Sequence, residues 1–125
     1  MKKELLNSDK ELLLKDLCAR LPYGVKCIVN SDGYVSFISS IESQYGVVTF
    51  DDGRQEEICD IKPYLFPLSS MTGRLKAELF NLRIDIEDPF QDTLCEIDFY
   101  HRNHFDYRGL IPMGLAIDAT NKNIY

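Results

Sequence analysis

The first part of the chain has apolar positions at helical spacing. They are Leu13, Leu14, Leu17, Cys18 and Leu21. This 3.6-residue spacing gives one apolar stripe, and Ser8 with Glu11 has the spacing of a capping box. Pro22 favours the end of the helix. The pattern predicts an N-terminal helix within residues 1–24, in which Asp16 and Arg20 form an i,i+4 pair on the solvent side.

The period of the pattern changes to two after residue 24. Alternating or Val-rich segments lie at residues 25–29, 34–41, 46–50 and 54–61. Within 34–41, the apolar face is expected to consist of Val35, Phe37 and Ile41. Asp51-Asp52-Gly53 is the strongest hairpin signal between these segments. Short strands with tight turns predict an antiparallel meander, which must bend or pack on a helix to bury one face. Two prolines predict that residues 63–68 leave the sheet as a rigid connector.

Helical spacing returns in the C-terminal half. Polar residues at 69–72 offer N-caps for an amphipathic helix that reaches Arg83. Residues 84–91 are acidic and predict a loop, or a short strand followed by a loop. A further helix is expected from Thr93 to about Asn103, and residues 115–117 could be a last short strand at a sheet edge.

These elements predict one α+β domain over residues 1–125. An N-terminal helix (1–24) is expected to precede a small bent antiparallel sheet or SH3-like barrel (25–68). The C-terminal part (69–125) is expected to contribute two helices packed on the sheet. A chain of 125 residues with 45% hydrophobic residues is sufficient for one core.

The net charge of −6 makes nucleic acid an unlikely partner. Nucleic-acid binding needs clustered Lys and Arg, whereas the 14 basic residues of this chain are scattered among 20 acidic ones. An acidic surface fits a basic protein partner better.

The sequence also favours a cytoplasmic protein with reduced thiols and no membrane segment. Polar and charged residues at positions 7 and 9–11 interrupt any signal-peptide core, and no apolar run has membrane-spanning length. The cysteines lie far apart, at Cys18, Cys27, Cys59 and Cys95, without zinc-site spacing. A disulfide between Cys27 and Cys59 across a sheet stays open.

The segment YHRNHFDYRG, residues 100–109, carries the densest chemistry. On a helix His101 and His104 share a face, and together with Asp106 they could hold a transition metal. The other interpretation is structural, with His104 capping the helix end and an Asp106–Arg108 ion pair closing a turn at a positive-φ Gly109.

Sequence motifs give little support to catalysis. The chain has no nucleophile elbow, phosphate-binding loop, dinucleotide fingerprint or zinc-protease motif, and no cofactor is expected. Tyr, Phe and Arg are favoured as anchors of protein interfaces. Tyr100, His104, Tyr107 and Arg108 are therefore the predicted contacts to a partner.

Two resemblances add to this interpretation. The segment VVTFDDGRQEEICDIKPYL resembles Tudor-like and other SH3-like barrels, and this implies a strongly bent barrel over residues 25–65. The segments LLLKDLCARLPYGVKC, DIKPYLFPLSSMT and NHFDYRGLIPMGLAI resemble a family of small proteins encoded by gut anaerobic bacteria and by their phages and mobile elements. The family implies no activity and no catalytic residues.

The function expected from the sequence is therefore that of a non-catalytic binding module, encoded by a phage or mobile element. It would bind a host protein or sequester a small ligand, with a homo-oligomer as an open option. The alternative is a small metal-dependent hydrolase or nuclease that uses His101, His104 and Asp106.

Overall fold

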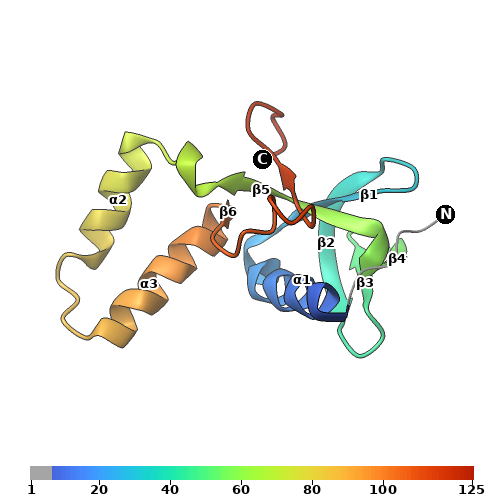
Figure 1. Cartoon of the computed structure of the whole chain (residues 1–125), viewed down its shortest axis with the longest axis horizontal. Helices are drawn as coiled ribbons and strands as arrows, with labels where there is room; N and C mark the ends of the chain where they lie inside the picture. Colours follow the sequence, from blue (N-terminus) through green and yellow to red (C-terminus); the bar gives the residue numbers. More distant parts are fainter. Residues whose placement is uncertain (1–6) are drawn as a thin grey trace.

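The computed structural model describes residues 7–125 and confirms the α+β class (Figure 1). Helix α1 (Asn7–Arg20) precedes a mixed sheet, and α2 (Gly73–Arg83) and α3 (Pro89–Arg102) follow its fifth strand. The strands are β1 (Lys26–Val29), β2 (Val35–Glu42), β3 (Val47–Phe50), β4 (Gln55–Glu57), β5 (Ile61–Pro67), β6 (Phe105–Asp106) and β7 (Ile117–Asp118). Ser8 lies within α1 and not at its N-cap, so the predicted capping box is wrong.

The first four strands form the predicted antiparallel meander. Neighbouring strands pair in the order β4-β3-β2-β1, and buried and half-buried residues alternate along β1 and β3. The pairing of β2 with β3 shifts register between Ile38 and Ser40. A bulge of this kind bends a strand, and it brings Ile38 into the core. The expected apolar face of Val35, Phe37 and Ile41 is therefore wrong for Val35, which is exposed, and for Phe37, whereas Ile41 packs against the core.

Residues 61–67 are a strand, so the predicted connector is wrong. β5 pairs antiparallel with β1 and parallel with β6 and β7. The Asn30 N–H donates to the Asp60 carbonyl at 2.7 Å, and hydrogen-bonded pairs alternate along an antiparallel ladder. Pro63, opposite Cys27, therefore falls in a pair that needs no N–H toward β1. The proline is compatible with a central strand for this reason.

The main core lies between α1 and the sheet. Its buried side chains include Leu13, Leu17, Val25, Cys27, Val29, Ile38, Val48, Phe50, Ile58, Ile61, Leu65 and Leu110. A smaller cluster joins the C-terminal helices to the ends of β5 and β6 and contains Leu79, Phe99 and Phe105. In Figure 1 the α2–α3 hairpin projects away from the sheet, with only the C-terminal end of α3 next to β6. The body and the hairpin thus have separate apolar clusters.

Side-chain caps set where the hairpin helices begin. The Thr72 hydroxyl accepts a hydrogen bond from the Leu75 N–H at 3.2 Å, which confirms the predicted start of α2. The Asp88 carboxylate accepts from the Phe90 N–H at 3.0 Å, and Pro89 occupies the first turn. α3 therefore begins before the predicted Thr93. No helix within residues 7–125 combines the length and the apolar character needed to cross a membrane.

The central position of β5 predicts a large cost for truncating Leu65. Leu65 is fully buried, so Leu65→Ala should lower the free energy of unfolding by about 2–5 kcal/mol in urea titrations. Leu82→Ala, at an exposed position of α2, is the matched control and should cost less than about 1 kcal/mol. Equal losses in the two variants would contradict the placement of β5.

Candidate functional site

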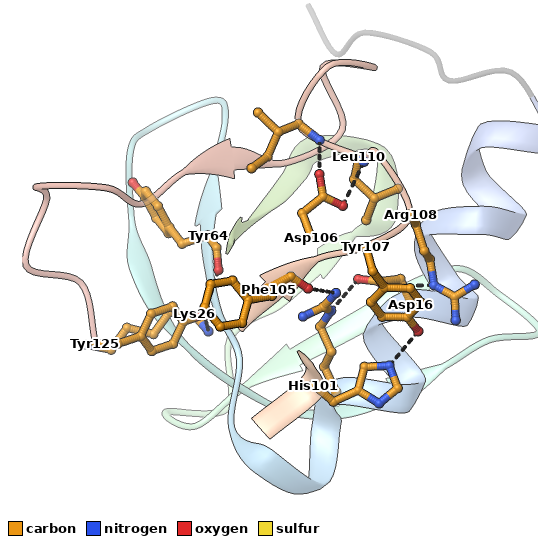
Figure 2. Close-up of polar contacts among 12 residues, drawn as sticks. Asp16, Lys26, Tyr64, His101, Phe105, Asp106, Tyr107, Arg108, Leu110 and Tyr125 are labelled. Carbon is orange, nitrogen blue, oxygen red and sulfur yellow. Dashed lines mark hydrogen bonds and ion pairs between the residues drawn. The ribbon is translucent and has the colours of Figure 1, made fainter. Parts of the chain in front are cut away.

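A buried ion pair within α1 anchors the C-terminal part of the chain. Asp16 and Arg20 are both 0% exposed, and Arg20 Nε lies 2.7 Å from Asp16 Oδ2. Arg20 Nη2 also donates to the Phe105 carbonyl of β6 at 2.7 Å. Arg108 Nε donates to Asp16 Oδ1 at 3.0 Å, and Figure 2 shows the two side chains facing each other. The Asp16–Arg20 pair, which was expected on the solvent side, is therefore buried. Together with Arg108 it forms a buried joint between α1 and residues 105–108.

Asp106 closes the turn that follows β6. Its two carboxylate oxygens accept the backbone N–H groups of Leu110 and Ile111, each at 2.9 Å (Figure 2). Gly109 has a φ of 77°, as the turn prediction required. The predicted ion pair between Asp106 and Arg108 is wrong, because Arg108 pairs with Asp16 of α1. The turn is held by charge-assisted bonds to the backbone, and Arg108 is left to bind α1.

Tyr107 lies at the centre of the aromatic contacts. Its ring stacks on Tyr100 with centroids 5.7 Å apart, and the Arg108 guanidinium lies 4.9 Å from the ring centroid. Its hydroxyl is 2.7 Å from His101 Nε2. Burial raises the pKa of Tyr107, and burial together with the Arg20 charge lowers the pKa of His101. The two groups therefore form a neutral hydrogen-bonded pair at neutral pH.

His104 has a separate environment between α3 and β6. Its φ is 63°, and its ring stacks on Tyr125 with centroids 3.6 Å apart. The predicted role of its side chain as a helix cap is not found; its backbone N–H donates to the His101 carbonyl instead. His104 Nδ1 is buried and has no hydrogen-bond partner within residues 7–125. Burial, followed by the Arg20 charge, lowers its pKa to about 4.

Tyr125 closes this corner and was not found from the sequence. Its hydroxyl accepts from the Lys26 N–H and donates to the Tyr64 carbonyl, both at 2.9 Å. Figure 2 shows its ring next to Lys26 and Tyr64. The available signal was the apolar pair Ile124-Tyr125 after the polar run at 120–123. This pair ties the last residues to β1 and β5.

The predicted metal ligands do not converge. Asp106 is used by two backbone amides, His101 faces Tyr107, and His104 stacks on Tyr125. Within the described part of the chain, no three His, Cys, Asp or Glu side chains are grouped so that they could hold a metal ion. The His/His/Asp arrangement on which the hydrolase alternative depended is thus not formed.

The four residues predicted to contact a binding partner all make contacts inside the molecule. Tyr100, Tyr107 and Arg108 come together, whereas His104 packs separately on Tyr125. All four side chains are only half-buried, so each keeps some accessible surface. Their contact with a partner stays a prediction, and their intramolecular bonds give each of them a structural role.

The aromatic residues of the meander make contacts within the chain. Phe50 is buried in the core with the edge of Tyr34 against it at 5.3 Å. The Arg54 guanidinium covers the Tyr34 ring at 4.6 Å, and Lys26 Nζ lies 4.9 Å from the Phe37 centroid. The rings of Tyr34 and Phe37 therefore already have cations of the same chain over their faces.

A groove along α2 is a second candidate site, and the sequence did not indicate it. Its volume is about 370 Å³, and it is lined by Met71, Lys76, Leu79, Phe80, Arg83, Ile84, Ile86 and Asp92. Arg83 is fixed by Asp92 through two bonds of 2.6 and 2.7 Å and also contacts Glu96. The helical pattern of the sequence includes Phe80 with Leu75, Leu79 and Leu82, but it does not indicate that Phe80 and Ile84 are exposed.

No protein-family model, curated protein or solved structure matches the chain. The functional interpretation therefore depends on the geometry of these two regions.

The buried joint predicts that Asp16→Asn strongly lowers the stability of the fold. The substitution removes the carboxylate that lies between two guanidinium groups and leaves Arg20 buried without its counter-charge. The free energy of unfolding should fall by about 3–5 kcal/mol in urea titrations. Glu11→Gln, at an exposed position on the same helix, is the control and should change it by less than about 0.5 kcal/mol. A loss below about 1 kcal/mol for Asp16→Asn would contradict the joint.

His104 predicts a loss of stability in mild acid. The pKa of this side chain is about 4 in the folded chain and near 6.5 when exposed, so the unfolded chain binds more protons between these values. The free energy of unfolding should fall as the pH is lowered from about 6.5 to about 4, by roughly 2–3 kcal/mol from this group. His104→Phe keeps a ring against Tyr125 and should flatten this slope in urea titrations at several pH values. An unchanged slope would assign the effect to other groups.

Proposed function

We propose that the chain is a non-catalytic binding module that recognises a protein partner through the α2–α3 hairpin. The observation that supports this is the concentration of exposed large apolar side chains there. They are Phe80, Leu82, Ile84, Phe90 and Leu94. Exposed large apolar side chains that gather on one part of a folded protein mark a candidate interaction site.

The α2–α3 hairpin buries few side chains of its own, so packing within the hairpin does not explain why these exposed residues are apolar. Leu79 is the one buried side chain of α2, and Phe80 and Phe90 are 62% and 67% exposed. An aromatic side chain contributes roughly 2–3 kcal/mol when it passes from water into an apolar contact. A partner that covers the hairpin would gain this free energy without any change in the body of the domain.

The buried polar corner would then serve as the support of the hairpin. The Asp16–Arg20–Arg108 joint fixes residues 105–108 against α1, and Tyr100 packs on Phe99 and Phe105 beside the hairpin cluster. In this proposal Tyr100 and Tyr107 orient α3, and any contact they make with a partner lies at the edge of the interface.

The finer assignments of fold and origin are also proposals. A meander β1–β4, a 3-10 turn at Ile58–Asp60 and a return strand β5 on β1 support an SH3-like barrel. The three-segment resemblance supports a phage or mobile-element origin, and with it a host protein as the partner in a cytoplasmic setting.

Capture experiments with surface variants test the binding function. Immobilised chain is exposed to a gut-anaerobe lysate, and retained proteins are quantified by mass spectrometry. A protein held by the wild type should be lost at least about fivefold in Phe80→Ser and Phe90→Ser, because the apolar contact is removed. Tyr45→Ser is the control, since Tyr45 is also 67% exposed but lies on the β2–β3 turn. Circular dichroism should be unchanged in all variants. No protein lost selectively from the hairpin variants would contradict the proposal.

A further inference from the structure

Residues 120–125, which we call the latch, are held to the sheet at their far end. The first four of these residues are exposed. Asn121 and Asn123 have φ values of 63° and 53°, a conformation that turns the chain back on itself. In Figure 1 the latch, in red, loops away from the sheet after β7 and returns to it. The position of the latch therefore depends on the contacts of its last two residues.

The Tyr125 hydroxyl lies at the open end of the β1–β5 ladder. The register of these strands places Lys26 opposite Tyr64, one position beyond their last pair. The hydroxyl accepts from the Lys26 N–H and donates to the Tyr64 carbonyl, both at 2.9 Å, so it bridges two groups that could otherwise bond directly. Lys26 Nζ also donates to the Ile124 carbonyl at 2.7 Å. Three hydrogen bonds thus close the latch.

The ring of Tyr125 covers one face of His104. The two rings are stacked, with centroids 3.6 Å apart and an angle of 8° between their planes. Phe37 and Phe66 stand around the same tyrosine ring, with centroids 6.4 and 6.1 Å from it. Movement of the latch away from the sheet would therefore return a face of the imidazole to water.

The closed latch leaves His104 no acceptor for a second proton. Every imidazolium carries an N–H at Nδ1, but this atom is buried and has no hydrogen-bond partner within residues 7–125. Arg20, whose Nη1 is likewise buried and unpaired in that range, adds the repulsion of a neighbouring cation. Attraction of an imidazolium to the Tyr125 ring opposes these effects. Burial and the Arg20 charge nevertheless lower the pKa of His104 to about 4.

The elements around His104 carry other ionisable groups, which do not supply the missing counter-charge. They are Asp16 and Arg20 on α1, Lys26 on β1, Tyr64 on β5, His101 and Arg102 on α3, Asp106 on β6, Asp118 on β7, and Lys122 and Tyr125 on the latch. Each of the three carboxylates among them accepts hydrogen bonds from groups other than His104. A proton on His104 therefore adds an unbalanced charge to this corner.

We propose that residues 120–125 are an acid-sensitive latch, closed while His104 is neutral and opened when His104 is protonated. Protonation places a cation beside Arg20. Withdrawal of Tyr125 lets water solvate that cation, at the cost of the three hydrogen bonds that close the latch. The body of the domain keeps its core, because the latch residues lie outside the main apolar cluster. The α2–α3 hairpin takes no part, so this inference is independent of the proposed binding function.

The direction of the response follows from proton linkage. The pKa of His104 is about 4 under the closed latch and near 6.5 in water, so the open form binds more protons between these values. A falling pH therefore favours the open form. Opening frees the Lys26 N–H and the Tyr64 carbonyl and uncovers the rings of Phe37 and Phe66. This part of the sheet becomes accessible in mild acid.

An NMR titration of the full ¹⁵N-labelled chain from about pH 7 to about pH 4 tests the latch. The amide signals of Lys26 and Tyr125 should move toward unfolded positions with a midpoint between about pH 4 and 6.5, and the His104 ring should titrate with the same midpoint. The amide of Val48, in the main core, should keep its position. Simultaneous loss of all signals would show unfolding instead of opening. That result, or a Lys26 signal that does not move, would overturn the proposal.

Two variants assign the response to His104 and to the latch contacts. His104→Phe keeps a ring against Tyr125 but cannot be protonated, so the Lys26 signal should move at least about fivefold less than in the wild type. Tyr125→Phe keeps the stack and removes two hydrogen bonds, so the midpoint should rise by at least about half a pH unit. If His104→Phe does not fold, Tyr125→Phe decides alone. An equal movement in His104→Phe, or an unchanged midpoint in Tyr125→Phe, would overturn the latch.

Discussion

The carboxylate of Asp16 is the interaction on which the arrangement of the chain depends. It lies in the interior with Arg20 on one oxygen and Arg108 on the other, and Arg20 extends to the backbone of β6. Such a group is costly to bury and becomes favourable only when all its bonds are made. The network therefore specifies one position of the C-terminal segment against α1, in addition to contributing stability. The orientation of the α2–α3 hairpin depends in turn on the position of that segment.

The stability of the body and the availability of the hairpin follow from separate apolar clusters. α1 and the sheet bury their side chains against each other, whereas the hairpin reaches the body through a small cluster around Phe99 and Phe105. Exposed aromatic residues on the hairpin can consequently be covered by another molecule without rearrangement of the main core. The separation also explains why surface variants of α2 test binding and core variants of β5 test folding.

Local pattern was sufficient for most of the elements but not for the joint. Spacing identified α1 and the meander, and spacing together with the Thr72 cap identified α2, because those signals lie within a few residues of each other. The strand β5 was not predicted, because a proline is compatible with a central strand only where no N–H is needed toward the neighbouring strand. Whether Pro63 meets this condition depends on its register with β1. The sequence predicts a surface pair for Asp16 and Arg20, because the third member of the network, Arg108, lies 92 positions from Asp16 and is not visible in the local pattern. Phe80 belongs to the apolar pattern that predicts α2, but spacing alone does not show that Phe80 and Ile84 stay exposed in the fold.

The position of that third partner has a consequence for synthesis of the chain. A nascent chain that has reached only residue 100 contains α1 and all of β1–β5, yet Arg20 lacks the Phe105 carbonyl and Asp16 lacks Arg108. Closing α1 over the sheet at that point would bury charges with part of their bonds missing. Residues 105–108 have to leave the ribosome before the first helix can settle, and the domain is expected to fold once this segment is available rather than from its N-terminus.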